Sequence, residues 1–212
     1  MNAGVLHLSI GFGAAPERDA PRASTAEQAL ILAAQAGDSA AFGRLVQSYQ
    51  KPLLRYLCRL VRRDDVGQDL CQETMLRAWR RLRDFDTSRP MAPWLYRIAT
   101  NLALNFLQRR SWRWVPLLFG RQLEAKEAEP DLPSEEESAE ALLLRIEDIG
   151  QVQAALERLE PSHRAPLLLY YGEDLSCKEL AEALEVSETA AKVRLFRARA
   201  HLKTLLQTGD SP

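Results

Sequence analysis

The stretch from Trp94 to Arg110, WLYRIATNLALNFLQRR, constrains the fold more than any other part of the chain. Its apolar residues recur every three or four positions, which is the spacing of one buried helix face. A second line of polar residues lies on the opposite side and contains Arg97, Asn101, Asn105 and Gln108. Asn is a poor helix former, so two of them four positions apart need an explanation. This face is either ordinary solvated surface or a surface that hydrogen-bonds bases and phosphates.

The composition favours a helical protein. Of the 212 residues, 46% are hydrophobic and only 7% are aromatic, and Ala, Leu, Arg and Glu dominate. No hydrophobic run reaches the length of a membrane span and the first residues are a poor signal peptide, so we expect no membrane insertion. Three cysteines without CxxC spacing predict reduced thiols. The sequence has no phosphate-cradling loop, metal-ligand spacing or nucleophile–base pair, and we expect no cofactor, no metal and no enzymatic activity.

Charge is unevenly distributed along the chain, although the net charge is only −1. Residues 29–115 contain fifteen Lys or Arg against seven Asp or Glu, a net charge of +8. Residues 116–150 contain three against ten, a net charge of −7. The basic block favours a polyanionic partner such as nucleic acid. The acidic block suggests the hypothesis that it lies transiently over the basic block in the free protein.

These patterns divide the chain into four parts. Residues 1–25 have no periodicity and are predicted to be disordered. Residues 26–115 form a first helical domain, in which Pro52 is expected to kink or divide a long helix. Residues 116–148 form an acidic linker and residues 149–208 a second helical domain. The segment Trp112–Phe119 either folds back on the first domain or forms an exposed patch.

The helix predicted within DVGQDLCQETMLRAWRRL, residues 65–82, has an apolar residue in the middle of a polar face. Its polar face comprises Asp69, Gln72, Glu73, Leu76 and Arg80. Glu73 and Arg77 can pair across one turn. Leu76 is either one of the single exposed leucines that are common on proteins or the centre of a docking patch for a partner helix.

The second domain has the pattern of a helix-turn-helix. Ser176 and Glu179 form a capping box, a short turn follows at Glu185 and Val186, and Ser187 caps the next helix. That helix is predicted to place apolar residues inward and basic ones outward, the basic ones being Lys192, Arg194, Arg197, Arg199 and Lys203. Two short helices, a tight turn and a basic second helix are typical of DNA binding.

Together these segments resemble a bacterial sigma factor of the extracytoplasmic-function group, within the sigma-70 family. Residues 65–82 resemble the family's core-polymerase-binding stretch, and residues 85–110 its promoter-melting stretch. Residues 159–202 resemble its minus-thirty-five reading domain. The resemblance implies an all-α fold with a sigma-2-like helical bundle and a sigma-4-like helix-turn-helix, joined by the acidic linker. It implies a cytoplasmic factor that binds core RNA polymerase and directs promoter recognition and transcription initiation for a stress or envelope-response regulon.

The resemblance also assigns residues and partners. The clamp helices of the β′ subunit would contact Asp69, Gln72, Glu73, Leu76 and Arg80. The minus-ten promoter element would contact Trp94, Arg97, Asn101, Asn105, Arg109 and Arg110. An aromatic ring at position 94 would suit an unstacked base. The minus-thirty-five element would contact Lys192, Val193, Arg194, Phe196, Arg197 and Arg199. An anti-sigma factor is a further implied partner.

The second domain departs from the family pattern at three positions. Glu185 stands where the family usually has Gly, which costs about 1 kcal/mol if the backbone there is left-handed. Ala190 and Val193 replace hydroxyl donors, so the minus-thirty-five sequence is expected to be unusual or phosphate contacts to dominate. The alternative function is a helix-turn-helix regulator that acts without polymerase, but it leaves the faces around Leu76 and Asn101 unexplained.

Overall fold

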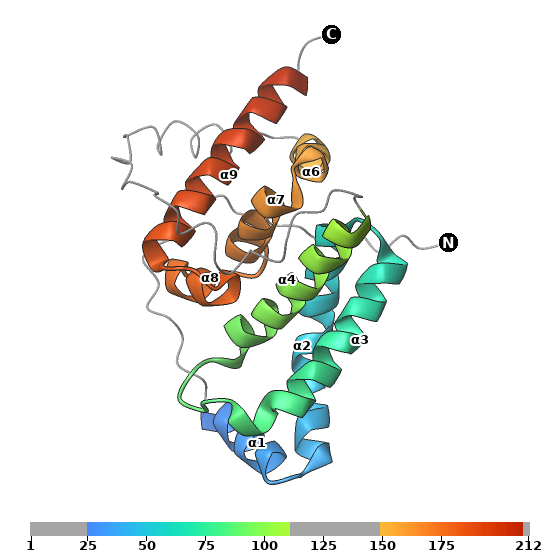
Figure 1. Cartoon of the computed structure of the whole chain (residues 1–212), viewed down its shortest axis with the longest axis vertical. Coiled ribbons are helices and arrows are strands. Elements are labelled where there is room, and N and C mark those ends of the chain that lie inside the picture. The colour runs from blue at the N-terminus through green and yellow to red at the C-terminus, as the bar shows by residue number, and fades with distance from the viewer. Residues whose placement is uncertain (1–24, 111–148, 210–212) are drawn as a thin grey trace.

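The computed structural model describes residues 25–110 and 149–209, and every element within these ranges is a helix (Figure 1). The expected all-α class is therefore confirmed. The predicted N-terminal extension, the segment Trp112–Phe119 and the acidic linker, with the hypothesis about its charge, lie outside the described residues. None of the described helices is long and apolar enough to cross a membrane. The first range contains α1 (Thr25–Gln35), α2 (Ser39–Val61), α3 (Asp64–Arg81), the short 3-10 helix η1 (Leu82–Asp84) and α4 (Met91–Arg110).

The second range holds the remaining five elements. These are α6 (Ile149–Arg158), α7 (Pro161–Leu167), the π-helical turn η2 (Leu168–Gly172), α8 (Cys177–Leu184) and α9 (Glu188–Gly209). The π-helical turn follows Pro166, which lies inside α7 and has no N–H to donate to the carbonyl of Ser162. The helix-turn-helix expected from the sequence corresponds to α8 and α9.

Helix α2 starts as the sequence predicts but does not divide. The Asp38 carboxylate accepts hydrogen bonds from the backbone N–H groups of Ala40 at 2.8 Å and Ala41 at 3.1 Å, which caps the first turn. Pro52 lies inside the helix, and α2 continues through it to Val61. The expectation that Pro52 could divide the helix is wrong, because apolar residues on both sides of it, Leu45 and Leu53, are buried and hold the two halves in place.

The first of two apolar clusters belongs to the N-terminal domain alone. It joins α1, the first half of α2, the end of α3 and the start of α4 through Ile31, Leu45, Ala78 and Leu95, all of which are buried. This cluster fixes the angle at which α3 and α4 leave the loop between them. It therefore positions the two faces to which the sequence assigns function.

The second apolar cluster runs through both domains. It begins with buried residues of α2 and α4, such as Leu57 and Ala99, and continues without interruption into Leu169, Leu180 and Leu195 of the C-terminal domain. Figure 1 shows that α8 lies against α4. Helix α7 also contacts α2. The two domains thus share a core. We call their contact, where α2 and α4 meet α7, η2 and α8, the seam.

Candidate nucleic-acid interface

The polar face predicted on α4 is present, and it lies at the seam. Asn101 is exposed and Arg97 is half-buried, on the side of α4 that meets α8. Asn105 is also half-buried, one turn further along. Arg109 and Arg110 belong to the last turn of α4, and their side chains lie outside the described part of the structure.

A single carboxylate occupies the centre of this face. The side-chain amide of Asn101 donates to Glu185 Oε2 at 2.8 Å, and Arg97 Nη1 lies 3.7 Å from Glu185 Oε1. Glu185 comes from the turn between α8 and α9, so the two oxygens of one residue of the second domain bind two residues of the first. A second contact joins the loop before α4 to α8. Arg89 Nη1 in that loop lies 3.5 Å from Oε1 of Glu182. Two of the residues expected to bind DNA, Arg97 and Asn101, are therefore paired with a carboxylate in this conformation.

Trp94 does not lie where the sequence predicts. Its side chain is buried in the first apolar cluster, and its ring packs on Phe85 with ring centroids 4.8 Å apart. In this conformation the ring is therefore not exposed to an unstacked base. The physical reason is that the loop carrying Phe85 folds under the start of α4 and supplies an aromatic partner, which the helical pattern of α4 alone cannot reveal.

The helix-turn-helix forms through the caps that the sequence predicts. Ser176 Oγ accepts from the backbone N–H of Glu179 at 3.3 Å, and Glu179 Oε2 accepts from the N–H of Ser176 at 2.9 Å. Ser187 Oγ caps α9 by accepting from the N–H of Ala190 at 3.1 Å. Glu185 ends α8 in the left-handed conformation with φ of 55° and ψ of 47°. The condition stated for Glu185 in the sequence analysis is therefore met, because the backbone there is left-handed and the residue is not glycine.

Helix α9 separates the residues proposed for the minus-thirty-five element into two groups. Lys192 and Arg197 are exposed, Lys192 in an ion pair with Glu188 at 3.1 Å, while Arg194 and Phe196 are half-buried. Val193 is buried, on the side of α9 opposite its apolar stripe, so its side chain does not lie at the surface in this conformation.

Arg199 is the second correction on α9. Its side chain is buried, its Nε donates to the hydroxyl of Tyr171 at 2.7 Å, and its guanidinium lies 5.6 Å from the ring centre of Tyr170. Arg199 flanks the inward-facing Ala198, and its long side chain lets it reach the two tyrosines. The expected outward orientation of Arg199 is wrong, and we regard it as a structural residue of the second domain.

The face expected to meet polymerase is separate from the seam. Asp69, Gln72 and Arg80 are exposed on α3, and Arg77 Nε pairs with the half-buried Glu73 at 2.6 Å as expected. The Leu76 side chain is 51% exposed, which confirms its predicted position outside the buried stripe. Trp79 was missed by sequence reasoning. It is partly exposed, packs on Phe42 with ring centroids 4.7 Å apart, and lies three positions after Leu76, a spacing that could have revealed it.

The seam also has a buried guanidinium that sequence reasoning did not single out. Arg164 of α7 donates hydrogen bonds to three carbonyls at and just after the end of α6, those of Leu156, Glu157 and Leu159. It also donates to the carbonyl of Leu60 at the end of α2, at 2.9 Å. Burial, followed by the charge of Arg62, lowers the pKa of Arg164 to about 10. The carbonyls of α6 are five to eight positions away in the sequence, but the contact with Leu60 of α2 cannot be recognised from the local pattern of α7.

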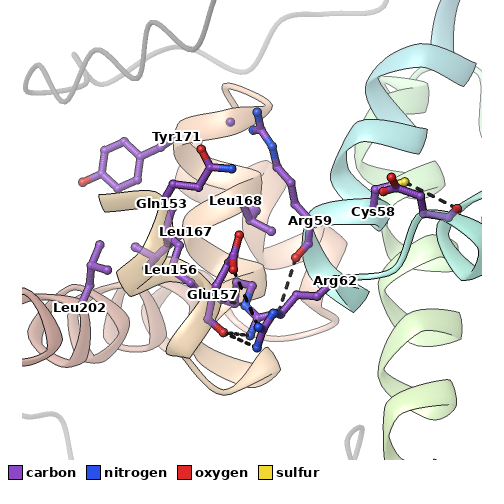
Figure 2. A pocket seen from close by; sticks show the side chains of 13 residues that line it. Cys58, Arg59, Arg62, Gln153, Leu156, Glu157, Leu167, Leu168, Tyr171 and Leu202 are labelled. Atoms are coloured by element: carbon purple, nitrogen blue, oxygen red, sulfur yellow. Dashed lines mark hydrogen bonds and ion pairs between the residues drawn. The ribbon is translucent and has the colours of Figure 1, made fainter. Parts of the chain in front are cut away.

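A cavity of about 360 Å³ lies beside Arg164, with walls from both domains (Figure 2). Arg62 donates to the carbonyl of Glu157 at 2.8 Å across this cavity. Its remaining walls are mainly apolar and include Leu156, Leu168 and Leu202. Within residues 25–110 and 149–209, no three His, Cys, Asp or Glu side chains gather closely enough to hold a metal ion.

The carboxylate of Glu173 also pairs with residues of the first domain across the seam. The Glu173 side chain is only 4% exposed, accepts from the hydroxyl of Tyr96 at 2.6 Å and lies 3.4 Å from Arg55 Nη2. Burial raises the pKa of Glu173 above its ordinary value, against the opposing effects of Tyr96 and the neighbouring arginines. In each of these contacts an acidic residue of the second domain meets a residue of the basic first domain.

Comparison with known proteins agrees with this geometry. Sigma-70 region 2 matches residues 45–113, and sigma-70 region 4 matches residues 149–202. The RNA polymerase sigma factor NccH of Alcaligenes xylosoxydans xylosoxydans is 34% identical over 185 residues, which cover 87% of this chain and 96% of that protein. The ECF RNA polymerase sigma-E factor of Haemophilus influenzae is 31% identical over 191 residues, covering 85% of this chain and 95% of that protein.

Among solved structures, CnrH in complex with the cytosolic domain of CnrY is similar, with a TM-score of 0.61 and 26% identity over 88% of this chain and 99% of that one. Two helical domains with a polar α4 face and a helix-turn-helix define a sequence-specific transcription factor of the sigma class. The chain belongs to the extracytoplasmic-function group of the sigma-70 family of RNA polymerase sigma factors.

Proposed function

We propose that this chain binds core RNA polymerase through α3 and reads promoter DNA through α4 and α9. The observation that carries the proposal is the presence, in one chain, of an exposed apolar and acidic face around Leu76 that is spatially separate from two basic faces. A helix-turn-helix regulator acting without polymerase has no use for the Leu76 face. The factor directs promoter recognition and transcription initiation.

Each surface supports one part of this function. Leu76 and Trp79 offer an apolar centre, and Asp69, Gln72, Glu73 and Arg80 a polar rim, for the β′ clamp helices. Arg97, Asn101 and Asn105, continued by Arg109 and Arg110, supply amides and cations for the minus-ten element. Lys192, Arg194, Phe196 and Arg197 remain available on α9 for the minus-thirty-five element. The proposal no longer includes Trp94, Val193 or Arg199 as direct DNA contacts.

Further features follow from the same assignment. The factor acts in the cytoplasm, where its polymerase is, and makes or breaks no covalent bond itself. It serves a stress or envelope-response regulon and is held inactive by an anti-sigma factor. The solved structure of CnrH in complex with the cytosolic domain of CnrY supports, by likeness, the existence of a protein partner besides polymerase.

The experiment that tests the proposal compares two exposed leucines. Leu76→Asp should weaken binding to core polymerase by about 1–3 kcal/mol, as for a moderate hot spot, and should reduce run-off transcription from a genomic promoter pool at limiting factor concentration. Leu32 on α1 is 55% exposed and lies away from α3, so Leu32→Asp is the matched control and should behave like wild type. Both variants should keep wild-type thermal stability, because neither side chain is buried. Undiminished capture of polymerase by Leu76→Asp would refute the assignment of α3.

A further inference from the structure

The cavity beside Arg164 is large enough to hold a small molecule. Its volume of about 360 Å³ lies near the lower end of the range of about 300–1,000 Å³ that ligand pockets span. A water fills about 30 Å³ in the liquid, so the cavity has room for roughly a dozen non-hydrogen atoms. None of the described residues that line it belongs to α4 or α8, so it is separate from the faces to which the sequence assigns DNA and polymerase.

Much of the cavity wall is apolar and comes from the second domain. Leu156 lies on α6, Leu167 and Leu168 lie where α7 passes into η2, and Leu202 lies on α9. The last three are buried by the protein around them, so this wall is held in a fixed shape. Transfer of an aliphatic chain from water onto such a wall is favourable.

The charged groups of the lining differ in what they already bind. The lining contains three arginines and two carboxylates, those of Arg59, Arg62, Arg164, Asp64 and Glu157. Arg164 donates to backbone carbonyls of α2 and α6, and Arg62 donates to the carbonyl of Glu157. The guanidinium of Arg59, by contrast, has no hydrogen bond or ion pair within residues 25–110 and 149–209.

Arg59 is placed to receive an anion inside the cavity. Its half-buried side chain extends from α2 to the η2 turn (Figure 2), where Nη1 lies 3.8 Å from the position that a Cβ atom of Gly172 would occupy. Burial, followed by the charge of Arg55, lowers the pKa of Arg59, and Glu173, which acts in the opposite direction, is bound to Arg55 and Tyr96. The planar guanidinium matches the two oxygens of a carboxylate.

We propose that this cavity binds an amphipathic carboxylate, with the head group on Arg59 and an aliphatic chain against the leucines of the wall. The site does not depend on the proposed function. Because the walls come from both domains, a bound molecule contacts both, and its concentration would raise the stability of the full-length protein.

The test is calorimetric titration of the full-length protein with decanoate, whose size matches the cavity. Octanoate and dodecanoate test the length of the chain, and decyltrimethylammonium carries the chain of decanoate on a cationic head. Arg59→Gln removes the charge. Gln153→Trp places a large ring on an exposed position of the lining. Arg44→Gln is the matched control, because Arg44 is exposed on the same helix as Arg59 and does not line the cavity.

Decanoate should bind saturably with a Kd on the order of 100 μM. It should bind roughly tenfold more tightly than octanoate, because each buried methylene contributes about three- to fourfold. Dodecanoate should gain less than about twofold more, since the cavity is then full. Arg59→Gln and the cationic head should each weaken binding about tenfold or more, as expected for a lost hydrogen bond to a charged group. Gln153→Trp should weaken binding, and Arg44→Gln should change it by less than about twofold.

Several results would overturn the proposal. One is the absence of saturable binding of decanoate in the millimolar range. Another is equal binding by wild type and Arg59→Gln, or by wild type and Gln153→Trp, which would place the ligand elsewhere. Affinity that rises undiminished to dodecanoate, or equal binding of the cationic analogue, would indicate adsorption to the surface. These last two comparisons use wild-type protein alone, so they decide the proposal even if a variant does not fold. None of the measurements involves polymerase or DNA, so their failure leaves the proposed function intact.

Discussion

Arg197 and Arg199 lie two positions apart on α9 and have opposite environments. Arg197 is exposed on the helix expected to read DNA, whereas the Arg199 guanidinium is buried against Tyr170 and Tyr171. Two arginines in the same helix thus provide a direct comparison of a binding role with a structural role.

Substituting each arginine by alanine should separate the two roles. Arg197→Ala should weaken DNA binding by about 1–3 kcal/mol if the guanidinium contacts a base edge, with no loss of thermal stability. Arg199→Ala should lower the free energy of unfolding by about 1.5–3 kcal/mol, because a buried charged hydrogen bond is lost. Urea titrations and binding isotherms measure the two quantities. Destabilisation by Arg197→Ala but not by Arg199→Ala would contradict the structure.

Residue-level prediction from the sequence succeeded where the neighbours along the helix decide the outcome. The exposure of Leu76, the Glu73–Arg77 pair and the capping box at Ser176 all depend on spacing within one helix or turn. It failed for Trp94 and Arg199, whose partners come from other elements, Phe85 and Tyr171. Large side chains reach such partners from the edge of a helical stripe, so periodicity alone cannot place them.

At the scale of elements, the close contact of α2 and α3 depends on one glycine. A Cβ atom at Gly67 would lie 2.5 Å from Cys58 Sγ and 3.0 Å from the Cys58 backbone, so the two helices could not keep their present distance. Gly43, within α2, has no atom within 4 Å of the same position and has an ordinary helical backbone.

The two glycines should therefore respond in opposite directions to alanine. Gly67→Ala should destabilise the fold by about 1–3 kcal/mol through overpacking. Gly43→Ala should stabilise it by about 0.5–1 kcal/mol, because alanine loses less backbone entropy in a helix. Chemical denaturation of both variants checks this pair. Equal effects of the two substitutions would show that α2 and α3 are not packed as described.

At the scale of the whole molecule, the arrangement of the two domains could not be predicted from the sequence. Composition and motif order predict two helical domains, and the charge counts predict that the first is attracted to acidic groups. The acidic groups of the second domain that pair with it belong to Glu157, Glu173, Glu182 and Glu185. Each of these glutamates is an ordinary polar residue in its own segment, and only the shared core of α2, α4, α7 and α8 brings them to the seam.

The raised pKa of Glu173 makes the stability of this arrangement depend on pH. The folded protein holds the Glu173 proton more tightly than the unfolded chain, so this residue adds stability as the pH falls through its raised pKa. The contribution is complete below the ordinary value of 4.5. Glu173→Gln keeps an acceptor for Tyr96 and removes the buried charge, so it should match or exceed wild type in stability at about pH 8.

Thermal unfolding of wild type and Glu173→Gln between about pH 8 and pH 5 measures this effect. Their difference should shift in favour of wild type as the pH falls. Burial lowers the pKa of His163, so this residue makes the folded protein less stable as the pH falls, which is the opposite of the effect of Glu173. His163 contributes equally to both proteins and cancels in their difference. Parallel stability curves for the two proteins would show that Glu173 is not buried at the seam.

The placement of Arg164 has a consequence for the time course of holoenzyme assembly. Its guanidinium satisfies carbonyls at the ends of both α2 and α6, so the domains cannot part until these groups exchange their partners for water. At high polymerase concentration the observed rate of assembly should therefore reach a plateau, and the height of that plateau is the rate at which the domains part.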